Sequence, residues 1–140
     1  RACDNMARSK TGALIVIPHN SELKDIIRSG EKMNARISSS LIETIFFKNT
    51  PLHDGAMVIL GNRIAAARCI LPITERHDLD THFGLRHRAA IGISELSDAL
   101  AIVVSEEKGT ISLAINGELM HKISIVQLTT ELEKVIIEES

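Results

Sequence analysis

Two glycine–asparagine pairs constrain the fold of this 140-residue chain more than any other feature of its sequence. Gly61-Asn62 and Asn116-Gly117 each stand between two apolar runs of strand length, and a two-residue turn of this composition is typical of a β-hairpin. The expected strands are 56–60 and 63–70 around the first pair, and 110–115 and 118–123 around the second. Because hairpin strands are antiparallel, a sheet that contains both hairpins is at least partly antiparallel.

Strand-like and helix-like segments alternate around these hairpins. β-Branched runs at 13–17 and 100–104 predict two further strands, both buried. Helices are predicted at 22–29, from Ser40 with Glu43 at capping-box spacing, at 86–96 and at 124–139, and 1–9 resembles the end of a helix. We therefore expect one α/β domain over residues 1–140, with a mixed, partly antiparallel central sheet flanked by helices.

Composition limits what such a domain can do. Three Phe and no Trp or Tyr leave a core of Ile, Leu, Val, Ala and Met, and the net charge of −2 argues against sequence-independent binding of nucleic acid. Cys3 and Cys69 are isolated, which is typical of reduced, intracellular thiols. No apolar run approaches the ~20 residues that cross a bilayer. Because the sequence begins at Arg1 without Met, we expect a piece of a longer protein, with targeting or membrane segments upstream.

The first polar cluster is Leu52-His53-Asp54-Gly55-Ala56, directly before a predicted strand. An aspartate held by a glycine turn can bind a divalent metal and polarise a hydroxyl group for attack, and His53 could be a second ligand. The alternative is a plain turn, since Asp-Gly is common turn chemistry.

The second cluster, Arg86-His87-Arg88, enters a predicted helix. Cations at a helix N-terminus oppose the macrodipole, and a bound anion relieves that repulsion. Helix N-termini bind phosphate, and an arginine matches two phosphate oxygens at once, so this cluster indicates a phosphate site. The alternative is a solvated basic face.

Two further segments complete the set. Ser105-Glu106-Glu107 follows a predicted strand and suits phosphate and metal contacts, although acidic loops are also common. The small and apolar residues at 62–71 could form a floor for a nucleobase, or simply part of a packed core. Together, a metal-binding carboxylate and a phosphate clamp on one α/β scaffold suggest nucleotide chemistry.

These clusters, with their neighbours, resemble the diadenylate cyclase (DAC) domain family, whose paired signatures are DGA and RHR. The likeness covers about 7–117, and its ordered blocks are KTGALIVI at 10–17, NTPLHDGA at 49–56, IAAA at 64–67, RHRAAIGISE at 86–95 and VSEE at 104–107. Five ordered blocks are far more specific than two tripeptides.

The resemblance implies a mixed sheet wrapped by helices that binds one ATP per domain. It further implies a homodimer in which two domains meet face to face, each ATP's 3′-hydroxyl attacks the other's α-phosphorus, and cyclic di-AMP and two pyrophosphates result. ATP and a second copy are therefore the expected partners, and nucleic acid is not.

Individual roles also follow from the resemblance. The DGA residues Asp54, Gly55 and Ala56 would form the catalytic turn. Phosphates would be held by Arg86, His87, Arg88 and Ser105, and Leu71 would recognise adenine through its main chain. The metal, Mg²⁺ or Mn²⁺, would be bound by His53, Asp54 and Glu107.

The sequence departs from many relatives at two positions. Leu85 stands where they place Thr before RHR, and Ile70 stands where some carry a Tyr that stacks on adenine. The order of the blocks is most similar to the membrane-anchored type of cyclic di-AMP synthase. That type would place the full-length protein on the cytoplasmic face of a bacterial plasma membrane, with this fragment itself soluble.

Three alternatives are open from the residues. The HD pairs His53-Asp54 and His77-Asp78 occur in metal-dependent phosphohydrolases, although those enzymes carry the ligands on packed helices. A zinc site could be built from His77, His82 and His87. A non-enzymatic, nucleotide-binding regulator could also keep this fold without turnover.

Overall fold

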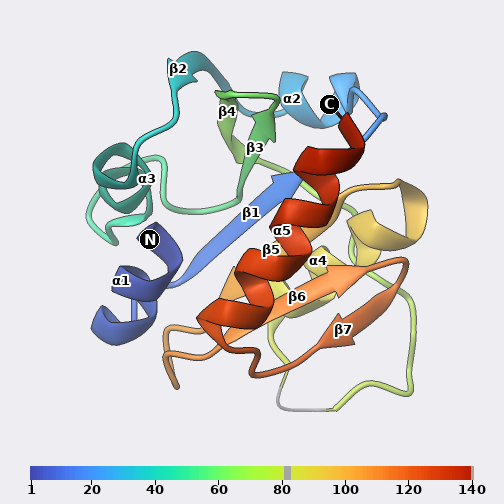
Figure 1. The fold of residues 1–140 in the computed structure, drawn as a ribbon. Coiled ribbons are helices and arrows are strands. Elements are labelled where there is room, and N and C mark those ends of the chain that lie inside the picture. The colour runs from blue at the N-terminus through green and yellow to red at the C-terminus, as the bar shows by residue number, and fades with distance from the viewer. Residues whose placement is uncertain (81–82, 140) are drawn as a thin grey trace.

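The computed structural model describes residues 1–80 and 83–139. Figure 1 shows a twisted sheet with helices packed against it. The helices are α1 (Ala2–Ser9), α2 (Lys24–Arg28), α3 (Ser39–Phe46), α4 (Leu85–Leu96) and α5 (Ile125–Glu139). The strands are β1 (Ala13–Ile17), β2 (Glu31–Arg36), β3 (Ala56–Leu60), β4 (Arg63–Cys69), β5 (Leu100–Val104), β6 (Ile111–Ile115) and β7 (Glu118–Met120).

The seven strands form one sheet in the order β2-β4-β3-β1-β5-β6-β7. β1 pairs in parallel with β3, and the other pairings described are antiparallel. Both predicted hairpins, β3–β4 and β6–β7, are present. The mixed, partly antiparallel sheet flanked by helices that the sequence predicts is therefore confirmed.

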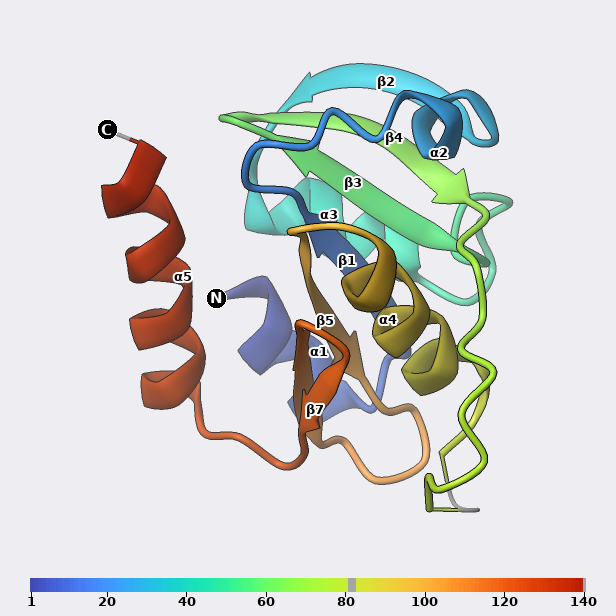
Figure 2. The same ribbon diagram turned by 90° about the vertical axis from the view of Figure 1, so that its right-hand side faces the viewer.

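Successive side chains of a strand point to opposite faces, and the sheet separates two apolar layers in this way. In β1, Ala13 and Ile15 pack into the layer that holds buried residues of α1, α3 and α5. Leu14 and Val16 pack into the opposite layer, beneath α4 and α2. Figure 2 shows α5 and α1 on one side of the sheet and α4 on the other. Every β1 residue from 13 to 16 is buried, as a central strand covered on both faces requires.

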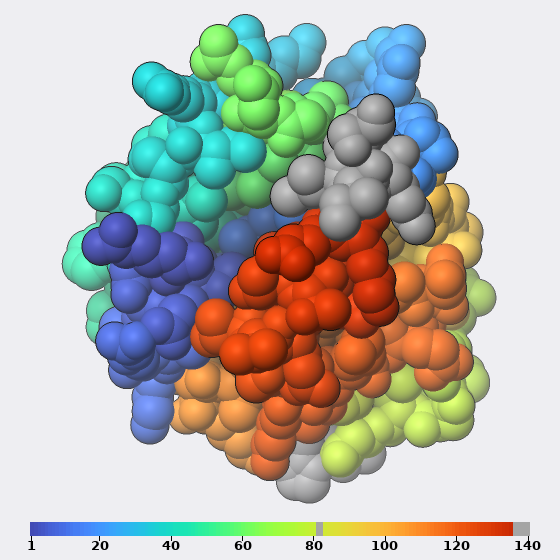
Figure 3. Space-filling model, in the orientation of Figure 1, coloured from blue at the N-terminus to red at the C-terminus, as the bar shows by residue number. Residues whose placement is uncertain are grey.

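Figure 3 shows α5 lying over the middle of one face of the molecule. The capping box predicted at its start is confirmed, because Ser124 Oγ accepts from Gln127 N at 3.1 Å and Gln127 Oε1 accepts from Ser124 N at 2.9 Å. None of the helices in the described part of the chain combines the length and apolarity required to span a bilayer.

One local prediction was wrong, and one strand was missed. The helix predicted from Ser40 begins one residue earlier, and its N-cap is Ser38, whose Oγ accepts from Leu41 N at 3.0 Å. Three consecutive serines offered the same spacing, and Glu43 accepts from Asn5 of α1 instead of completing a capping box. Strand β2 was not predicted at all, because its sequence EKMNAR has no apolar run. It is an edge strand held to β4 by backbone pairing, and edge strands are commonly polar.

Helix α4 is pressed against the segment that follows β4. A Cβ atom built on Gly92 would lie 2.1 Å from the Pro72 carbonyl oxygen and 3.0 Å from the Thr74 nitrogen. Thr74 N also donates to the Arg88 carbonyl oxygen at 3.1 Å. This contact fixes the start of α4 relative to the end of β4, and only glycine permits it.

We therefore predict that Gly92→Ala lowers the free energy of unfolding by about 1–3 kcal/mol, although alanine is the better helix former, because backbone atoms must move apart. Urea denaturation measures the loss. Gly84→Ala is the control, since a Cβ there meets nothing within 4 Å, and the loss of glycine at the N-cap of α4 should cost less than about 1 kcal/mol. Equal stability of the two variants would contradict the close packing of α4.

Candidate functional site

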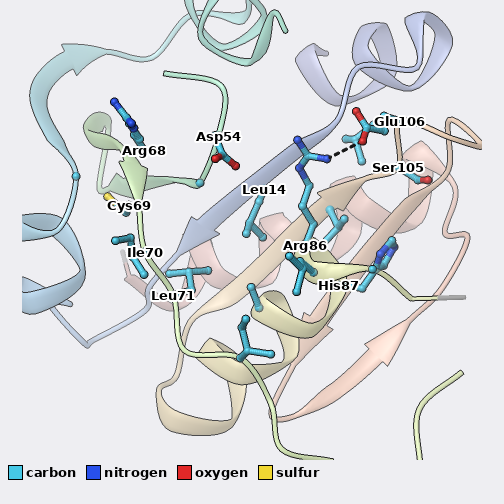
Figure 4. A pocket seen from close by; sticks show the side chains of 18 of the residues that line it. Leu14, Asp54, Arg68, Cys69, Ile70, Leu71, Arg86, His87, Ser105 and Glu106 are labelled. Atoms are coloured by element: carbon cyan, nitrogen blue, oxygen red, sulfur yellow. Dashed lines mark ion pairs between the residues drawn. The ribbon is translucent and has the colours of Figure 1, made fainter. Parts of the chain in front are cut away.

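The main pocket forms where the ends of four strands meet. Because β1 runs parallel to β3 and antiparallel to β5, the starts of β1 and β3 lie at the same edge of the sheet as the end of β5. The end of β4 joins them, since Cys69 pairs with Ala56. A cavity of about 1000 Å³ opens at this edge, between the strand ends and the start of α4. Figure 4 shows its lining side chains.

The Asp54-Gly55 turn forms one wall of the pocket. Gly55 has a φ of +101°, and a Cβ there would lie 2.8 Å from the Cys69 carbonyl oxygen. Glycine therefore allows the turn to press against the end of β4, which leaves the exposed Asp54 carboxylate at the cavity. The other three residues of the cluster, Leu52, His53 and Ala56, do not line the pocket. Ala56 is fully buried in β3, and His53 Nδ1 lies 2.7 Å from the Thr50 carbonyl oxygen.

Arg86 forms the opposite wall of the pocket (Figure 4). Its Nη1 lies 3.6 Å from Glu106 Oε1, and its side chain is 27% exposed. The guanidinium rests against Gly12, because a Cβ on Gly12 would lie 2.5 Å from Nη1 and 2.7 Å from Cζ. The missing side chain at Gly12 thus leaves the space that the Arg86 guanidinium occupies.

The next two residues of the RHR motif lie differently. His87 lines the pocket but is 8% exposed, and its ring stacks on Phe83 at a centroid distance of 5.1 Å. Burial, with smaller contributions from the positive charges of His121 and Arg86, lowers the pKa of His87, so its ring is neutral at neutral pH. Arg88 is outside the pocket lining, and its Nε donates to the Phe83 carbonyl oxygen at 3.3 Å.

The loop after β5 supplies the pocket's remaining polar groups. Ser105, Glu106 and Glu107 all line the cavity. Ser105 is held by its backbone, which donates to Thr110 O and accepts from Gly109 N, both at 2.9 Å. The predicted residues Asp54, Gly55, Leu71, Arg86, His87, Ser105 and Glu107 therefore share one cavity.

An apolar rim faces these polar groups. Leu71 is buried, whereas Ile70 and Leu85 are each 72% exposed at the pocket. Burial raises the pKa of the neighbouring Cys69 thiol to about 11, so this side chain behaves as an apolar part of the wall. Exposed aliphatic groups beside a polar cavity can cover the face of a flat ring.

Sequence reasoning missed several residues of the pocket, among them Ser29, Gly30 and Glu31, and it gave Arg68 no role of its own within the segment 62–71. Ser29 Oγ accepts from Ile70 N at 2.9 Å, and a Cβ on Gly30 would lie 2.3 Å from the Ala67 carbonyl oxygen. These contacts join the end of α2 to the end of β4. No motif signals them, because they depend on how the edge strand β2 returns to the sheet.

The pocket offers few donor groups for a metal ion. Among residues 1–80 and 83–139, no three or more His, Cys, Asp or Glu side chains come together as a metal site. Asp54 and Glu107 do share the pocket, and one or two carboxylates with substrate phosphates are the usual ligands of Mg²⁺. The donor set therefore fits a metal that arrives with a phosphorylated ligand.

The histidine alternatives have different positions. His82, one member of the zinc hypothesis, lies outside the described residues. Asp78, of the second HD pair, accepts from Arg76 Nε and Nη2, both at 2.9 Å, and this contact lowers the pKa of the carboxyl group. In the first HD pair, His53 Nδ1 lies against the Thr50 carbonyl oxygen, whereas Asp54 lines the pocket.

Comparisons with known proteins agree with this architecture. The family model described as DAC, "DisA bacterial checkpoint controller nucleotide-binding", matches residues 1–119. The cyclic di-AMP synthase CdaA of Bacillus subtilis is 46% identical over 133 residues, which are 95% of this chain and 49% of the relative. A diadenylate cyclase of Listeria monocytogenes is 47% identical over 96% of this chain and 48% of its own length.

Solved structures give the same result. A crystal structure of DacA from Staphylococcus aureus, a double mutant, has a TM-score of 0.89 at 45% identity and covers 94% of this chain and 87% of that one. A protein of Bacillus cereus described as a hypothetical membrane-spanning protein has a TM-score of 0.84 at 46% identity, over 88% of this chain and 60% of that one.

The chain belongs to the DAC family, a family of nucleotidyltransferases whose curated members include diadenylate cyclases. It spans about half the length of the two curated relatives described above. The predicted position of the full-length protein at a membrane stays a prediction.

The contact between Gly12 and Arg86 yields a prediction. In Gly12→Ala, the three atoms nearest the new Cβ all belong to the guanidinium, so this group must move while the backbone can stay in place. We expect a roughly tenfold weaker affinity for inorganic triphosphate, measured by calorimetry, because a charge-assisted hydrogen bond is worth about 1.5 kcal/mol or more.

The control is Arg86→Ala alone and in combination with Gly12→Ala. If Gly12 acts only by leaving room for the guanidinium, adding Gly12→Ala to Arg86→Ala changes nothing further. Two independent, additive losses of affinity would show that Gly12 matters for another reason.

Proposed function

We propose that the pocket binds one ATP and that the domain is half of a diadenylate cyclase. The observation that carries this proposal is the position of the Asp54 carboxylate and the Arg86 guanidinium on opposite walls of one cavity of about 1000 Å³. A group that can activate a hydroxyl and a group that can hold phosphate are thus separated by space for a nucleotide.

The lining suggests how ATP lies in the pocket. Arg86 and Ser105 supply charge and hydrogen-bonding groups for the phosphates, and the helix N-terminus beneath Arg86 adds backbone N–H groups. Leu71 and its exposed neighbour Ile70 provide an apolar edge for adenine. The main chain of Leu71 is proposed to recognise the base. His87 is neutral and packed on Phe83, so its proposed role is to support the phosphate site as a hydrogen-bonding group.

The reaction is proposed to join two such domains face to face. Asp54 accepts the proton of the 3′-hydroxyl of its own ATP, and the oxygen forms a bond to the α-phosphorus of the ATP in the facing copy. The bond from that phosphorus to the bridging oxygen breaks, and pyrophosphate leaves with the electron pair. The same exchange in the opposite direction closes the ring, so two ATP give cyclic di-AMP and two pyrophosphates. Two equivalent phosphodiester bonds suit two identical sites related by a two-fold axis.

Mg²⁺ or Mn²⁺ is the proposed cofactor, held by Asp54 and Glu107 together with the nucleotide. Such an ion would neutralise phosphate charge and lower the pKa of the attacking hydroxyl. The predicted ligand His53 does not line the pocket, so the proposed ligand set is Asp54, Glu107 and the nucleotide. Arg88 is proposed to act through the loop, since its contact with the Phe83 carbonyl holds the segment that precedes α4.

Mass spectrometry of the products formed from ATP and Mn²⁺ tests the proposed activity. Pyrophosphate and cyclic di-AMP are expected, and specific activity should fall steeply as the enzyme is diluted, because two copies share the reaction. Release of ADP or AMP would instead favour a phosphohydrolase. ATP binding without any product at high protein concentration would favour a silent regulator.

Asp54→Asn separates catalysis from binding. The amide keeps the size of the side chain but accepts no proton, so we expect the rate of synthesis to fall by about 10³-fold while the Kd for ATP changes less than about threefold. Single-turnover kinetics and calorimetry measure the two quantities. An Asp54→Asn enzyme with undiminished rate would remove Asp54 from the mechanism.

A further inference from the structure

Arg68 occupies a strained position in the wall of the pocket. Ala56 pairs with Cys69 and Val58 with Ala66, so two residues of β4, at 67 and 68, stand opposite one residue of β3. Such a bulge re-aims the side chain of the inserted residue. The φ of Arg68 is +57°, a left-handed conformation that is unfavourable for any residue with a side chain and suits glycine. Backbone strain of this kind is found preferentially at functional sites.

The bulge is fitted to the Asp54-Gly55 turn. A Cβ on Gly55 would lie 2.9 Å from the Arg68 carbonyl carbon and 3.0 Å from its Cα. Arg68 therefore leaves the backbone directly beside the turn that carries Asp54. Figure 4 shows Asp54 and Arg68 on the same side of the pocket, away from Arg86.

The Arg68 guanidinium is available for a ligand. The residue lines the pocket and is exposed. Within the part of the chain that the structure describes, its side chain makes no ion pair or hydrogen bond. Arg86, by contrast, is already paired with Glu106 on the other wall.

The two arginines face different phosphates in the proposed reaction. Arg86 holds the triphosphate of the ATP in its own pocket. The phosphorus that approaches Asp54 belongs to the ATP of the facing copy, because Asp54 activates a hydroxyl that attacks across the two-fold axis. Arg68, whose Cα lies against the turn that carries Asp54, therefore stands on the wall that the partner's triphosphate would approach.

We propose that Arg68 is a catalytic residue that acts on the nucleotide bound by the second copy. Its guanidinium contacts the triphosphate of that ATP and stabilises the charge that develops as the bond to pyrophosphate breaks. The O3′–phosphorus bond forms, the bridging oxygen leaves with the electron pair on pyrophosphate, and the 3′-hydroxyl proton passes to Asp54. The assignment rests on the proposed diadenylate cyclase activity, which the wild-type product assay tests separately.

Arg68→Gly is a well-matched variant, because glycine adopts the native φ without strain. The fold should be retained, with a melting temperature no lower than about 2 °C below wild type. We expect an unchanged Kd for ATP in dilute protein and a roughly 10²-fold lower rate of phosphodiester formation. Arg68→Lys, which keeps a charge but not the planar fork, should recover part of that rate.

Mixed dimers decide on which nucleotide Arg68 acts. A trace of one chain is mixed with a tenfold excess of an inert chain, and the linear dinucleotide made by the trace chain's Asp54 is measured. In the first mixture, a trace of the Arg68→Gly chain is combined with excess Asp54→Asn chain. Arg68 is then present only on the chain that holds the attacked ATP. In the second mixture, a trace of wild-type chain is combined with excess Asp54→Asn/Arg68→Gly chain. Arg68 is then present only on the chain that supplies Asp54. We expect slow synthesis in the first mixture and the full rate in the second.

The opposite pattern, fast in the first mixture and slow in the second, would overturn the proposal by placing Arg68 on the ATP of its own pocket. A third mixture, wild type with excess Asp54→Asn, has Arg68 on both chains. If all three mixtures give the same rate, Arg68 has no role in catalysis. If wild type forms no phosphodiester bond from ATP, the proposed function fails first and the role of Arg68 falls with it. An active wild type with an equally active Arg68→Gly overturns the role of Arg68 alone.

Discussion

The parallel pairing of β1 with β3 decides where the site can be. A parallel pair needs a long crossover, and here residues 18–55 supply it with α2, β2 and α3. Its consequence is that both strands begin at the same edge of the sheet, where the antiparallel strands β4 and β5 end. Polar residues that are far apart in the sequence, Asp54 before β3 and Ser105 after β5, meet there. An antiparallel β1–β3 pair would have placed them at opposite ends of the sheet.

Strand ends alone make an edge, and three close contacts turn that edge into a pocket. Gly55 lets the acidic turn touch β4, Gly92 lets α4 touch the segment after β4, and Gly12 leaves space for the Arg86 guanidinium. At each of these glycines, a neighbouring group occupies the space that a side chain would otherwise fill. The walls are therefore set by backbone packing, which fixes the separation of the Asp54 turn and the Arg86 side chain before any ligand arrives.

The sequence predicted the parts of this arrangement that local chemistry controls. Hairpin turns such as Asn116-Gly117 determine which strands pair, and the charge pattern at Arg86 and the turn at Asp54 mark the two walls. The features that the sequence did not predict depend on contacts between segments that are far apart in the chain. Strand β2 has no apolar run because it is an edge strand that pairs with β4 and packs only Met33 and Ala35 against the core. Nothing near Gly12 in the sequence shows that a guanidinium lies against it. The bulge at Arg68 was hidden for the same reason, since register is a property of two strands.

The proposed ligand-binding side chains on the two walls differ in exposure, and this difference agrees with a reaction shared by two copies. His87 is buried and Arg86 is about one-quarter exposed, so the proposed phosphate-binding side is largely complete within one chain. Asp54, Arg68 and Ile70 are exposed. A carboxylate that must activate a hydroxyl works better where water is excluded. The exposed half of the pocket therefore lacks a covering surface of its own, and a second copy that brings its ATP to Asp54 would supply both the cover and the phosphorus to be attacked.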